Sequence, residues 1–383
     1  MNEVIRWNDQ YYILASSSLA DGRTEVLKHG ETFAVFDRYG DIHQVLSGPQ
    51  GLYHEGTRFL SRFELSIWTQ RLMMLSASVK NDNALFSVDL TNSDLMLERQ
   101  RRIPRGTLHL SRTRFLWQGT WHERIRIQNY GTTKLPISIT IGIDTDFADL
   151  FEARGRKRLR RGSRLKTIRS KTGLVFGYKG LDGTIRRTNV RCSPAPKQVM
   201  ADGFKIETRI PPRAKMSWDI TVSCEIKPRR SQVVLSYDRA QREAEGALRE
   251  AKISDAHVYT SNEQFNHWLN RSLADLHMLL SETPQGLYPY AGVPWFSVPF
   301  GRDGIITALQ MLWMNPTIAR GVLGFLASTQ ATEVRPEQDA EVGKILHETR
   351  RGEMAALGEI PFGRYYGSVD ATPLFIVLGR RLL

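Results

Sequence analysis

The stretch Leu135-Pro-Ile-Ser-Ile-Thr-Ile-Gly-Ile143 decides the fold of the first half of this chain, because apolar residues occupy every second position. Successive side chains of a β-strand point to opposite faces of a sheet, so this alternation predicts a strand with one buried face. Similar runs occupy residues 32–36, 108–115 and 120–127, with turn pairs such as Asp182-Gly183 between runs. Many short strands at this spacing favour an antiparallel β-sandwich.

The run at residues 120–127 illustrates how such a strand divides its side chains. One face carries the apolar residues together with Glu123, and the other carries His122, Arg124 and Arg126. A strand with one apolar and one charged face lies between a core and solvent. We therefore predict a half-buried strand here, rather than an array of catalytic side chains.

The apolar spacing changes after about residue 232, where helical patterns replace alternation. Asn315 and Pro316 suit the N-cap and the first position of one of these helices. The segments with a helical pattern are residues 236–252, 262–280, 305–314, 316–329 and 371–378.

These two patterns predict an α+β multidomain chain. We expect an antiparallel β-sandwich over residues 1–230, a linker helix within residues 231–260 and a helical domain over residues 261–383. A length of 383 residues agrees with more than one domain, and a hydrophobic fraction of 41% excludes a disordered chain.

The net charge of +13 is concentrated in Arg154-Gly-Arg-Lys-Arg-Leu-Arg-Arg-Gly-Ser-Arg-Leu-Lys166. Such a segment is either a solvated basic loop between strands or a surface that binds a polyanion. It lacks interleaved aromatic residues on which bases could stack, which argues against a nucleic-acid partner.

Several other classes of protein have no support in the sequence. Cys192 and Cys224 are the only cysteines, which excludes a disulfide framework, and the scattered histidines give no metal motif. His347-Glu348 lacks the second histidine of a zinc helix. The sequence shows no signal-peptide pattern and no apolar run of about 20 residues, so we expect a cytoplasmic protein without a membrane span.

Two loops carry the residues most indicative of function. Residues 291–304 place Trp295, Phe296 and Phe300 beside Arg302 and Asp303, directly before an expected helix. Aromatic faces cover the C–H surfaces of a sugar ring, whereas carboxylate and guanidinium groups bind its hydroxyls. Residues 362–371 repeat this chemistry, so the sequence indicates an enzyme that acts on carbohydrate.

The same loops resemble those of the bacterial amylo-α-1,6-glucosidase family, the glycogen-debranching-like glycosidases. Near the start of the chain, residues 51–67 (Gly-Leu-Tyr-His-Glu-Gly-Thr-Arg-Phe-Leu-Ser-Arg-Phe-Glu-Leu-Ser-Ile) resemble the opening of that family's β domain. Further on, residues 291–304, 344–348, 351–354 and 361–374 resemble the first half of its catalytic domain.

The resemblance implies a β-sandwich followed by an (α/α)6 toroid, of which this chain would hold only a part. It implies hydrolysis of terminal α-glucosidic bonds, α-1,6 in particular, in an α-glucan or oligosaccharide. Two carboxylic acids act with inversion, and no cofactor is needed. Because the family's general base comes from late in the toroid, we expect it beyond Leu383 and expect this chain, as a truncated form, to be inactive or nearly so.

Asp370 is the general acid that the resemblance implies, and Tyr365, Tyr366 and Val369 beside it favour a raised pKa of its carboxyl group. The alternative is an ordinary N-cap of the helix at residues 371–378. Tyr366 is also expected to contact the substrate.

Several of the expected sugar-binding residues also have an alternative structural role. Arg302 and Asp303 would bind sugar hydroxyls, with Asp303 as a helix N-cap the alternative. Further expected contacts are Trp295, Phe296, His347 and Glu348. Trp295 and Phe296 also suit a core, and Glu348 suits an ion pair with Arg350 or Arg351.

Other polar residues are weaker candidates. The sequence around Glu353 and Glu359 gives little indication of a function. His54, Glu55 and Arg58 suit a buried polar network where the β-sandwich meets the helices. Three other functions remain open: a non-catalytic glucan-binding protein, a related α-glucosidase or trehalase-like enzyme, and a polyanion-binding protein that uses residues 154–166.

Overall fold

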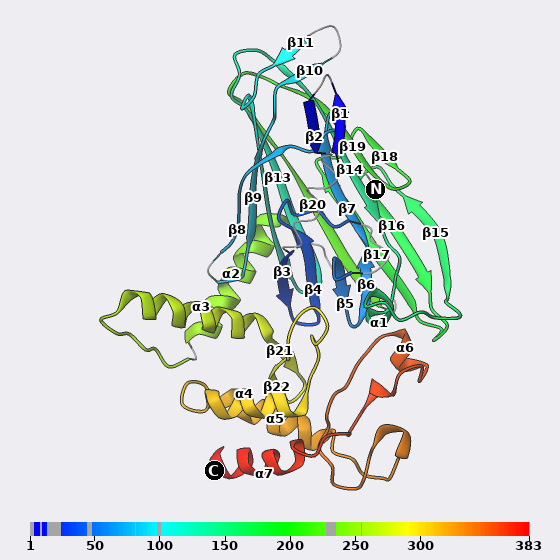
Figure 1. Cartoon of the computed structure of the whole chain (residues 1–383), viewed down its shortest axis with the longest axis vertical. Coiled ribbons are helices and arrows are strands. Elements are labelled where there is room, and N and C mark those ends of the chain that lie inside the picture. The colour runs from blue at the N-terminus through cyan, green and yellow to red at the C-terminus, as the bar shows by residue number, and fades with distance from the viewer. Residues whose placement is uncertain are drawn as a thin grey trace.

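The computed structural model describes residues 4–7, 10–13, 24–43, 48–80, 82–97, 101–226, 235–253 and 255–382. An elongated β region, residues 24–226, stands above most of a smaller helical region, residues 235–382, whose first helix lies beside the strands (Figure 1). The expected boundary near residue 230 falls within residues 227–234, outside the described residues. A separate hairpin of β1 (Val4–Trp7) and β2 (Gln10–Ile13) precedes the β region.

The β region is built from antiparallel sheets. The largest has eight strands in the order β15 (Ser163–Arg169), β16 (Gly173–Lys179), β17 (Ile185–Ser193), β20 (Lys215–Ile226), β13 (Thr120–Asn129), β12 (Leu108–Trp117), β9 (Phe86–Thr91) and β8 (Met73–Val79). A four-stranded sheet has the order β18 (Gln198–Met200), β19 (Gly203–Ile210), β14 (Leu135–Asp144) and β7 (Arg62–Ile67). Another runs β3 (Thr24–His29), β4 (Thr32–Asp37), β5 (Gly51–His54) and β6 (Thr57–Leu60), and β10 (Leu95–Leu97) pairs with β11 (Arg101–Ile103).

These sheets enclose one hydrophobic core, as the alternating pattern predicts. β14 buries every second residue from Leu135 to Ile143, and Ile125 and Ile127 of β13 belong to the same cluster. Inward-facing side chains of packed sheets form such a core. The predicted antiparallel β-sandwich is confirmed. The strand at residues 120–127 has the expected buried face, but His122 of its other face is also buried and stacks on Phe115.

The inward face of β13 also carries a charge into the core. Glu123 is fully buried, and its Oε1 accepts hydrogen bonds from Arg112 Nε at 2.7 Å and from Arg114 Nη2 at 3.1 Å. Arg112 Nη1 also donates to Asp41 Oδ1 at 2.5 Å. Buried charges persist only when they are paired and hydrogen-bonded, so this network has a structural role.

The described helices agree closely with the sequence pattern. They are α1 (Leu150–Ala153), α2 (Tyr237–Ile253), α3 (Glu263–Leu279), α4 (Gly301–Met311), α5 (Pro316–Ser328), α6 (Glu353–Ala356) and α7 (Ala371–Leu382), with short 3₁₀ turns η3 (Pro336–Gln338) and η4 (Pro361–Gly363). Asn315 caps α5 and Pro316 is its first residue, as predicted. α4 begins at Gly301, four positions before the expected start at residue 305.

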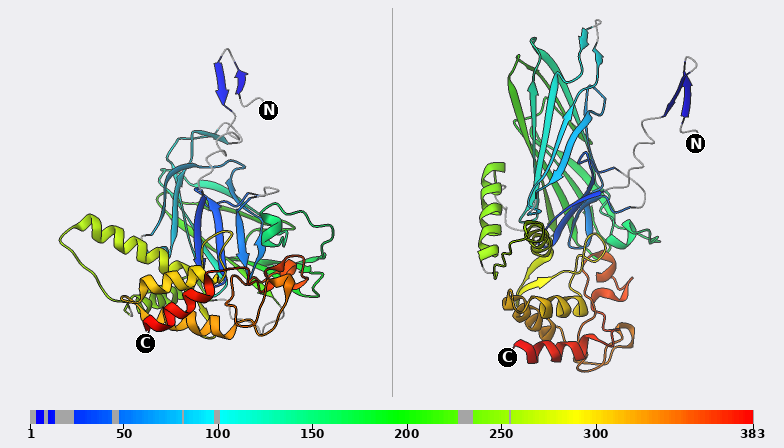
Figure 2. Two further views of the ribbon diagram at one scale, coloured as in Figure 1. Left: turned by 60° about the horizontal axis from the view of Figure 1, so that its bottom comes forward. Right: turned by 60° about the vertical axis from the view of Figure 1, so that its left-hand side comes forward.

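α2 lies along the outer face of the eight-stranded sheet (Figure 2), where Tyr237 and Thr113 join their hydroxyls at 2.8 Å. Below the β region, α4, α5 and α7 pack together with the hairpin of β21 (Leu280–Thr283) and β22 (Gly286–Pro289) (Figure 1). This stack encloses a second, smaller core around Ile305, Val322 and Leu378. No helix in the described part of the chain is long and apolar enough to cross a membrane.

Polar contacts hold the two regions against each other. Lys28 Nζ of β3 donates to Ser281 Oγ of β21 at 2.8 Å, and Met354 N of α6 donates to Asp149 Oδ2 at 3.1 Å. Both lysine and aspartate are buried. The loops between α3 and α7 are therefore held in place beneath the β-sandwich.

Candidate active site

A small backbone ladder brings the two functional loops together. Phe300, Glu348 and Tyr365 form antiparallel bridges in that order, so residues 300, 348 and 365 lie side by side. Gly301 N donates to the carbonyl oxygen of His347 at 2.8 Å, and a Cβ on Gly301 would collide with the carbonyl oxygen of Leu346. Only glycine allows this close approach, which sets the start of α4 against the segment at residues 346–348.

Arg302 and Asp370 meet where these loops converge. Arg302 Nη1, in the first turn of α4, donates to Asp370 Oδ2 at 3.0 Å, immediately before α7. The two side chains are 49% and 33% exposed, so the pair lies at the surface and is accessible to a ligand.

Asp370 carries an ionised carboxylate in this arrangement. The Ser368 hydroxyl donates to Asp370 Oδ1, and this bond, followed by the Arg302 guanidinium, holds the pKa of Asp370 below its usual value. The expectation of a raised pKa is therefore wrong, because two donors stabilise the charged form and burial is slight.

The capping role proposed as an alternative for Asp370 belongs instead to Ser368. Ala371 N, at the start of α7, donates to Ser368 Oγ at 3.2 Å. The carboxylate of Asp370 is thus directed to Arg302 and Ser368. Ser368 could have been found in the sequence, since a serine before a helix commonly accepts an amide hydrogen bond.

Asp303 is not the N-cap of α4, because Phe300 occupies that position and Asp303 lies in the first turn. A negative charge there is favoured by the positive end of the helix dipole. Arg302 and Asp303 line a hollow of about 220 Å³ together with Tyr290 and Thr307. The sequence pattern missed Tyr290, which directly follows β22, and Thr307, which occupies an ordinary helix position in α4.

The two aromatic residues of the first loop have different environments. Trp295 is half-buried and packs against Phe33, Tyr53 and Leu150 of the β region, which matches the alternative of an ordinary core residue. Phe296 is 44% exposed, and the Arg154 guanidinium lies 5.6 Å from the centre of its ring. Phe296 is thus the accessible aromatic face of this loop.

Glu348 and His347 lie on the central strand of the ladder. Glu348 is buried, and its Oε2 accepts a hydrogen bond from Arg350 Nε at 2.7 Å, as the ion-pair alternative proposed. His347 presents its ring between the edges of Phe300 and Tyr365, at 5.6 and 5.8 Å between ring centres. Its Nδ1 is buried without a hydrogen-bond partner among the described residues.

Tyr366 belongs to the helical core. It is buried, and its hydroxyl donates to the carbonyl oxygen of Thr329 at 2.8 Å. The neighbouring Tyr365 donates instead to Asp339 Oδ2 at 2.6 Å. Tyr366 therefore supports the position of the loop, and its hydroxyl is already engaged.

The two weaker carboxylate candidates lie at the contact between the regions. Glu353 is buried and accepts hydrogen bonds from the Tyr178 hydroxyl at 2.9 Å and from Leu181 N at 2.8 Å. Glu359 accepts from Arg158 Nε at 2.8 Å. Both groups bind the β region, so they have structural partners.

The residues His54, Glu55 and Arg58 form three separate polar contacts, of which only that of Glu55 crosses to the helical region, so the expected shared network is confirmed only in part. His54 Nδ1 and Thr32 Oγ1 lie 2.7 Å apart. Arg351 Nη1 donates to Glu55 Oε1 at 3.0 Å across the boundary. Arg58 is buried, and its Nε donates to both oxygens of the Asp146 carboxylate at 3.1 Å.

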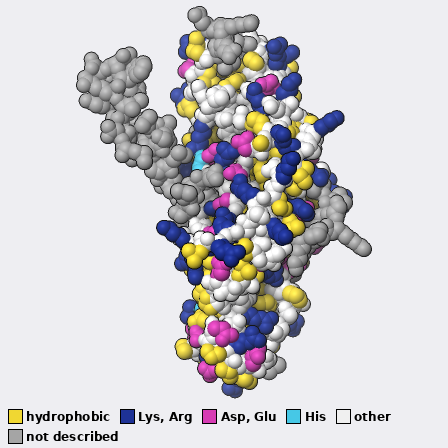
Figure 3. All heavy atoms as spheres, turned by 90° about the vertical axis from the view of Figure 1, so that its right-hand side faces the viewer, with side chains coloured by type: hydrophobic (Ala, Val, Ile, Leu, Met, Phe, Trp, Pro, Cys, Tyr) yellow, Lys and Arg dark blue, Asp and Glu magenta, His cyan; other side chains and the backbone are white. Residues whose placement is uncertain are grey.

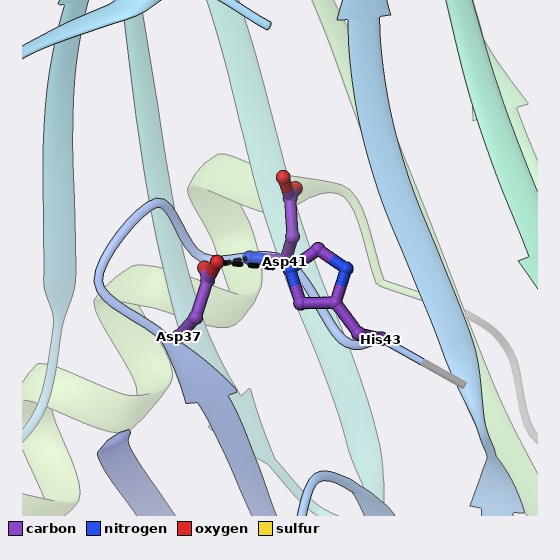
Figure 4. A group of neighbouring side chains, drawn as sticks. All are labelled: Asp37, Asp41 and His43. Carbon is purple, nitrogen blue, oxygen red and sulfur yellow. Dashed lines mark hydrogen bonds and ion pairs between the residues drawn. The ribbon is translucent and has the colours of Figure 1, made fainter. Parts of the chain in front are cut away.

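A cluster of Asp37, Asp41 and His43 places three potential metal ligands near one another (Figure 4). Both ring nitrogens of His43 are already bonded to carboxylates, Nε2 to Asp37 at 3.0 Å and Nδ1 to Glu64 at 2.8 Å. These bonds raise the pKa of His43 to about 9, so the ring is an imidazolium with no free lone pair. The cluster is an ion network rather than a metal site.

Comparison with known proteins identifies the β region. The family described as the N-terminal domain of (some) glycogen debranching enzymes matches residues 27–222, just over half of the chain. No curated protein matches the sequence.

The described fold also occurs among solved structures. A protein described as a kojibiose phosphorylase from the human microbiome aligns with a TM-score of 0.55 at 9% identity, over 79% of this chain and 46% of that one. This chain thus spans 46% of the length of that neighbour, and identity this low shows a shared fold alone.

Two further structures align over 53% of this chain at TM-scores too low to support an argument. A protein from Synechocystis sp. PCC 6803 has a TM-score of 0.33 at 12% identity, over 96% of its own length. A protein described as an aldose 1-epimerase from Escherichia coli K12 has a TM-score of 0.29 at 10% identity, over 99% of its length.

Proposed function

The chain belongs to the family defined by the N-terminal domain of glycogen debranching enzymes, and from this membership we propose that it is part of a glycoside hydrolase. The proposed substrate is an α-glucan or oligosaccharide, and the proposed bond is a terminal α-glucosidic linkage, α-1,6 in particular. The neighbour described as a kojibiose phosphorylase, which shares the fold, supports a carbohydrate-active enzyme.

The proposed organisation follows the expected division of the chain. Residues 1–230 form the β-sandwich domain, residues 231–260 a linker helix and residues 261–383 the first part of an (α/α)6 toroid. The pairwise packing of α4, α5 and α7 supports this arrangement, because a toroid of this kind is assembled from helical hairpins.

The observation that carries the proposal is the ion pair between Arg302 and Asp370 beside the hollow that Asp303 lines. Arg302 and Asp303 line this hollow, and Asp370 is joined to Arg302 at its side. A guanidinium with neighbouring carboxylates can bind several hydroxyls of a sugar ring. The exposed ring of Phe296 lies on the loop that leads into α4 and Arg302.

In the proposed mechanism, Asp370 protonates the leaving glycosidic oxygen, and Arg302 and Asp303 hold the sugar hydroxyls. Inversion requires a second carboxylate that activates water, at roughly 6.5–9.5 Å from the acid. Glu348 is already paired with Arg350, and Asp339 with Tyr365, so neither is proposed as this base.

The test is release of glucose from isomaltose and from maltotriose, followed by NMR so that the anomer is identified. We expect slow release of β-glucose by the wild-type chain and none by Asp370→Asn. Because Asp370 is largely ionised at neutral pH, the rate should rise about tenfold per unit as pH falls toward the pKa of this carboxyl. Release of α-glucose, or full activity of Asp370→Asn, would reject the assigned mechanism.

The lowered pKa of Asp370 favours one second candidate, a glucan-binding protein without catalysis. An ionised carboxylate binds hydroxyls well but cannot donate a proton. Binding of isomaltose without any release of glucose would support this candidate.

A further inference from the structure

A basic surface lies at one edge of the β region, far along the chain from the candidate active site. We name it the basic edge and define it as residues 154–169, which comprise the basic segment and strand β15. Figure 3 shows the side of the molecule on which β15 lies, with lysine and arginine side chains across it.

Part of this charge is used within the protein. Arg158 is buried and binds Glu152, Glu353 and Glu359, and Arg164 Nη2 donates to Asp144 at 3.2 Å. The bond from Arg158 to Glu353 holds the segment against α6. Several other basic side chains of the segment are not used in this way.

Four other basic residues of the same edge point to solvent. They are Lys157, Arg160, Lys166 and Arg169, which are exposed and form no ion pair with the described residues. Four free cations within thirteen residues make a concentrated positive field on one side of the molecule.

Strand β15 is the edge of the eight-stranded sheet. Its backbone pairs with β16 on one side, and no described strand pairs with the other side. Exposed edges accept an added strand from another chain, and basic side chains on an edge repel a second copy of the same edge. Arg164, Lys166 and Arg169 of β15 would therefore exclude self-association while attracting an acidic strand.

A hollow adjoins this edge and gives it an apolar part. Its volume is about 630 Å³, and it lies between the basic segment and α6. Leu159, Leu181 and Leu357 line it from three separate segments, each exposed, beside Lys157 and Arg160. If the charges served only to prevent another strand from pairing with β15, charged residues on the strand would be enough. The exposed leucines around the hollow would then have no role.

We propose that the basic edge is a docking surface for an extended acidic peptide segment of a partner protein. The segment adds to β15 as a further strand, its carboxylates face Lys157, Arg160, Lys166 and Arg169, and an apolar side chain enters the leucine-lined hollow. Strand addition supplies backbone hydrogen bonds, and alternate side chains supply selectivity.

Other anionic partners fit these features less well. A nucleic acid would find no aromatic platform among residues 154–169. A membrane surface is flat and cannot enter the hollow that the three leucines line. An extended peptide matches both the open strand edge and the hollow.

The experiment measures binding by fluorescence anisotropy at low and physiological salt. The probe is a labelled peptide that alternates glutamate and leucine. The comparison probes are an equally charged peptide that alternates glutamate and proline, vesicles that contain phosphatidylserine, and a single-stranded RNA. The variants are Lys157→Glu/Arg160→Glu/Lys166→Glu and, with the same change of charge at a distant exposed site, Arg209→Glu/Arg213→Glu/Lys215→Glu.

The glutamate–leucine peptide should bind the wild-type protein and the distant variant equally, and the basic-edge variant at least about tenfold more weakly. Proline removes the amide donors, so the glutamate–proline peptide should bind poorly. Equal binding of both peptides would overturn strand addition, and tighter binding of vesicles or RNA would assign the edge to that partner instead. Failure of every probe to bind, with both variants folded, would overturn the proposal altogether.

Discussion

Arg302 and Asp370 lie 68 positions apart in the sequence, and their side chains meet at 3.0 Å where α4 and α7 begin. The ladder of Phe300, Glu348 and Tyr365 produces this meeting by aligning the ends of three loops. The pair places a cation and an anion together at the surface, and Arg302 also lines the hollow beside Asp303. It is the feature on which the proposed carbohydrate site depends.

The first prediction concerns the two donors that hold Asp370 ionised. Ser368→Ala and Arg302→Ala should each raise the pKa of Asp370, because the hydrogen bond from Ser368 and then the Arg302 guanidinium hold this pKa low. A carboxyl group whose pKa is lowered by folding stabilises the protein at pH values above its pKa in the unfolded chain. This stability is lost as the pH falls through the pKa in the folded protein, so the free energy of unfolding should depend less on pH under acid conditions in both variants. Carbon-detected NMR titration of the Asp370 carboxyl would measure the shifts.

Neither variant should change the melting temperature greatly at neutral pH. Exposed ion pairs contribute roughly 0–1 kcal/mol, and this one is about half exposed on the arginine side. A fall in melting temperature as large as that of a core substitution would show that the pair is structural, contrary to the account.

The second prediction concerns Arg158, whose side chain is only 2% exposed. Arg158→Ala leaves Glu353 and Glu359 without this partner where the two regions meet. Breaking a buried pair costs about 3 kcal/mol or more, so the free energy of unfolding in urea should fall by about that amount. Arg160→Ala, at an exposed neighbour without an ion pair, serves as the control and should leave stability unchanged.

Much of the fold follows from the periodicity of the sequence. Alternation at residues 135–143 predicts a strand, and β14 runs from Leu135 to Asp144. Asn315 and Pro316 correctly predict the start of α5, because side-chain capping and a missing amide are local effects. Alternation also places Glu123 on the inward face, although its partners Arg112 and Arg114 depend on pairing between β12 and β13.

The candidate site was less predictable, because its contacts join distant segments. Local spacing suggests Asp303 as an N-cap, yet α4 begins earlier because Gly301 approaches Leu346, 45 positions away along the chain. Similarly, the pKa of Asp370 is lowered rather than raised, first by the hydroxyl of Ser368 and then by the Arg302 guanidinium from another helix. Long-range pairing of this kind leaves no periodic trace in the sequence.

The third prediction uses the pH dependence of His43. Its pKa is raised to about 9 by hydrogen bonds to Asp37 and then Glu64. A raised pKa gives stability that is fully present below the unfolded value near 6.5 and is lost as pH rises to about 9. The melting temperature should therefore fall across this window in the wild-type protein, and the fall should be smaller in His43→Gln.

The fourth prediction concerns the charges inside the β-sandwich. Glu123→Gln removes the carboxylate that Arg112 and Arg114 share in the core. The two buried positive charges then lose the negative charge that balances them, and the free energy of unfolding should fall by about 3–5 kcal/mol. Glu207→Gln, an exposed change on β19, is the matched control. Equal stability of the two variants would refute the structural role of the network.

Binding of isomaltose tests the central claim most directly, because it does not depend on whether this chain completes the reaction. Saturation-transfer NMR should detect isomaltose bound to the wild-type chain, with the signal lost in Arg302→Ala and in Asp303→Asn, while Arg160→Ala binds as the wild type does. Equal signals in all four proteins, or none from the folded wild-type chain, would contradict a sugar site at Arg302 and Asp370.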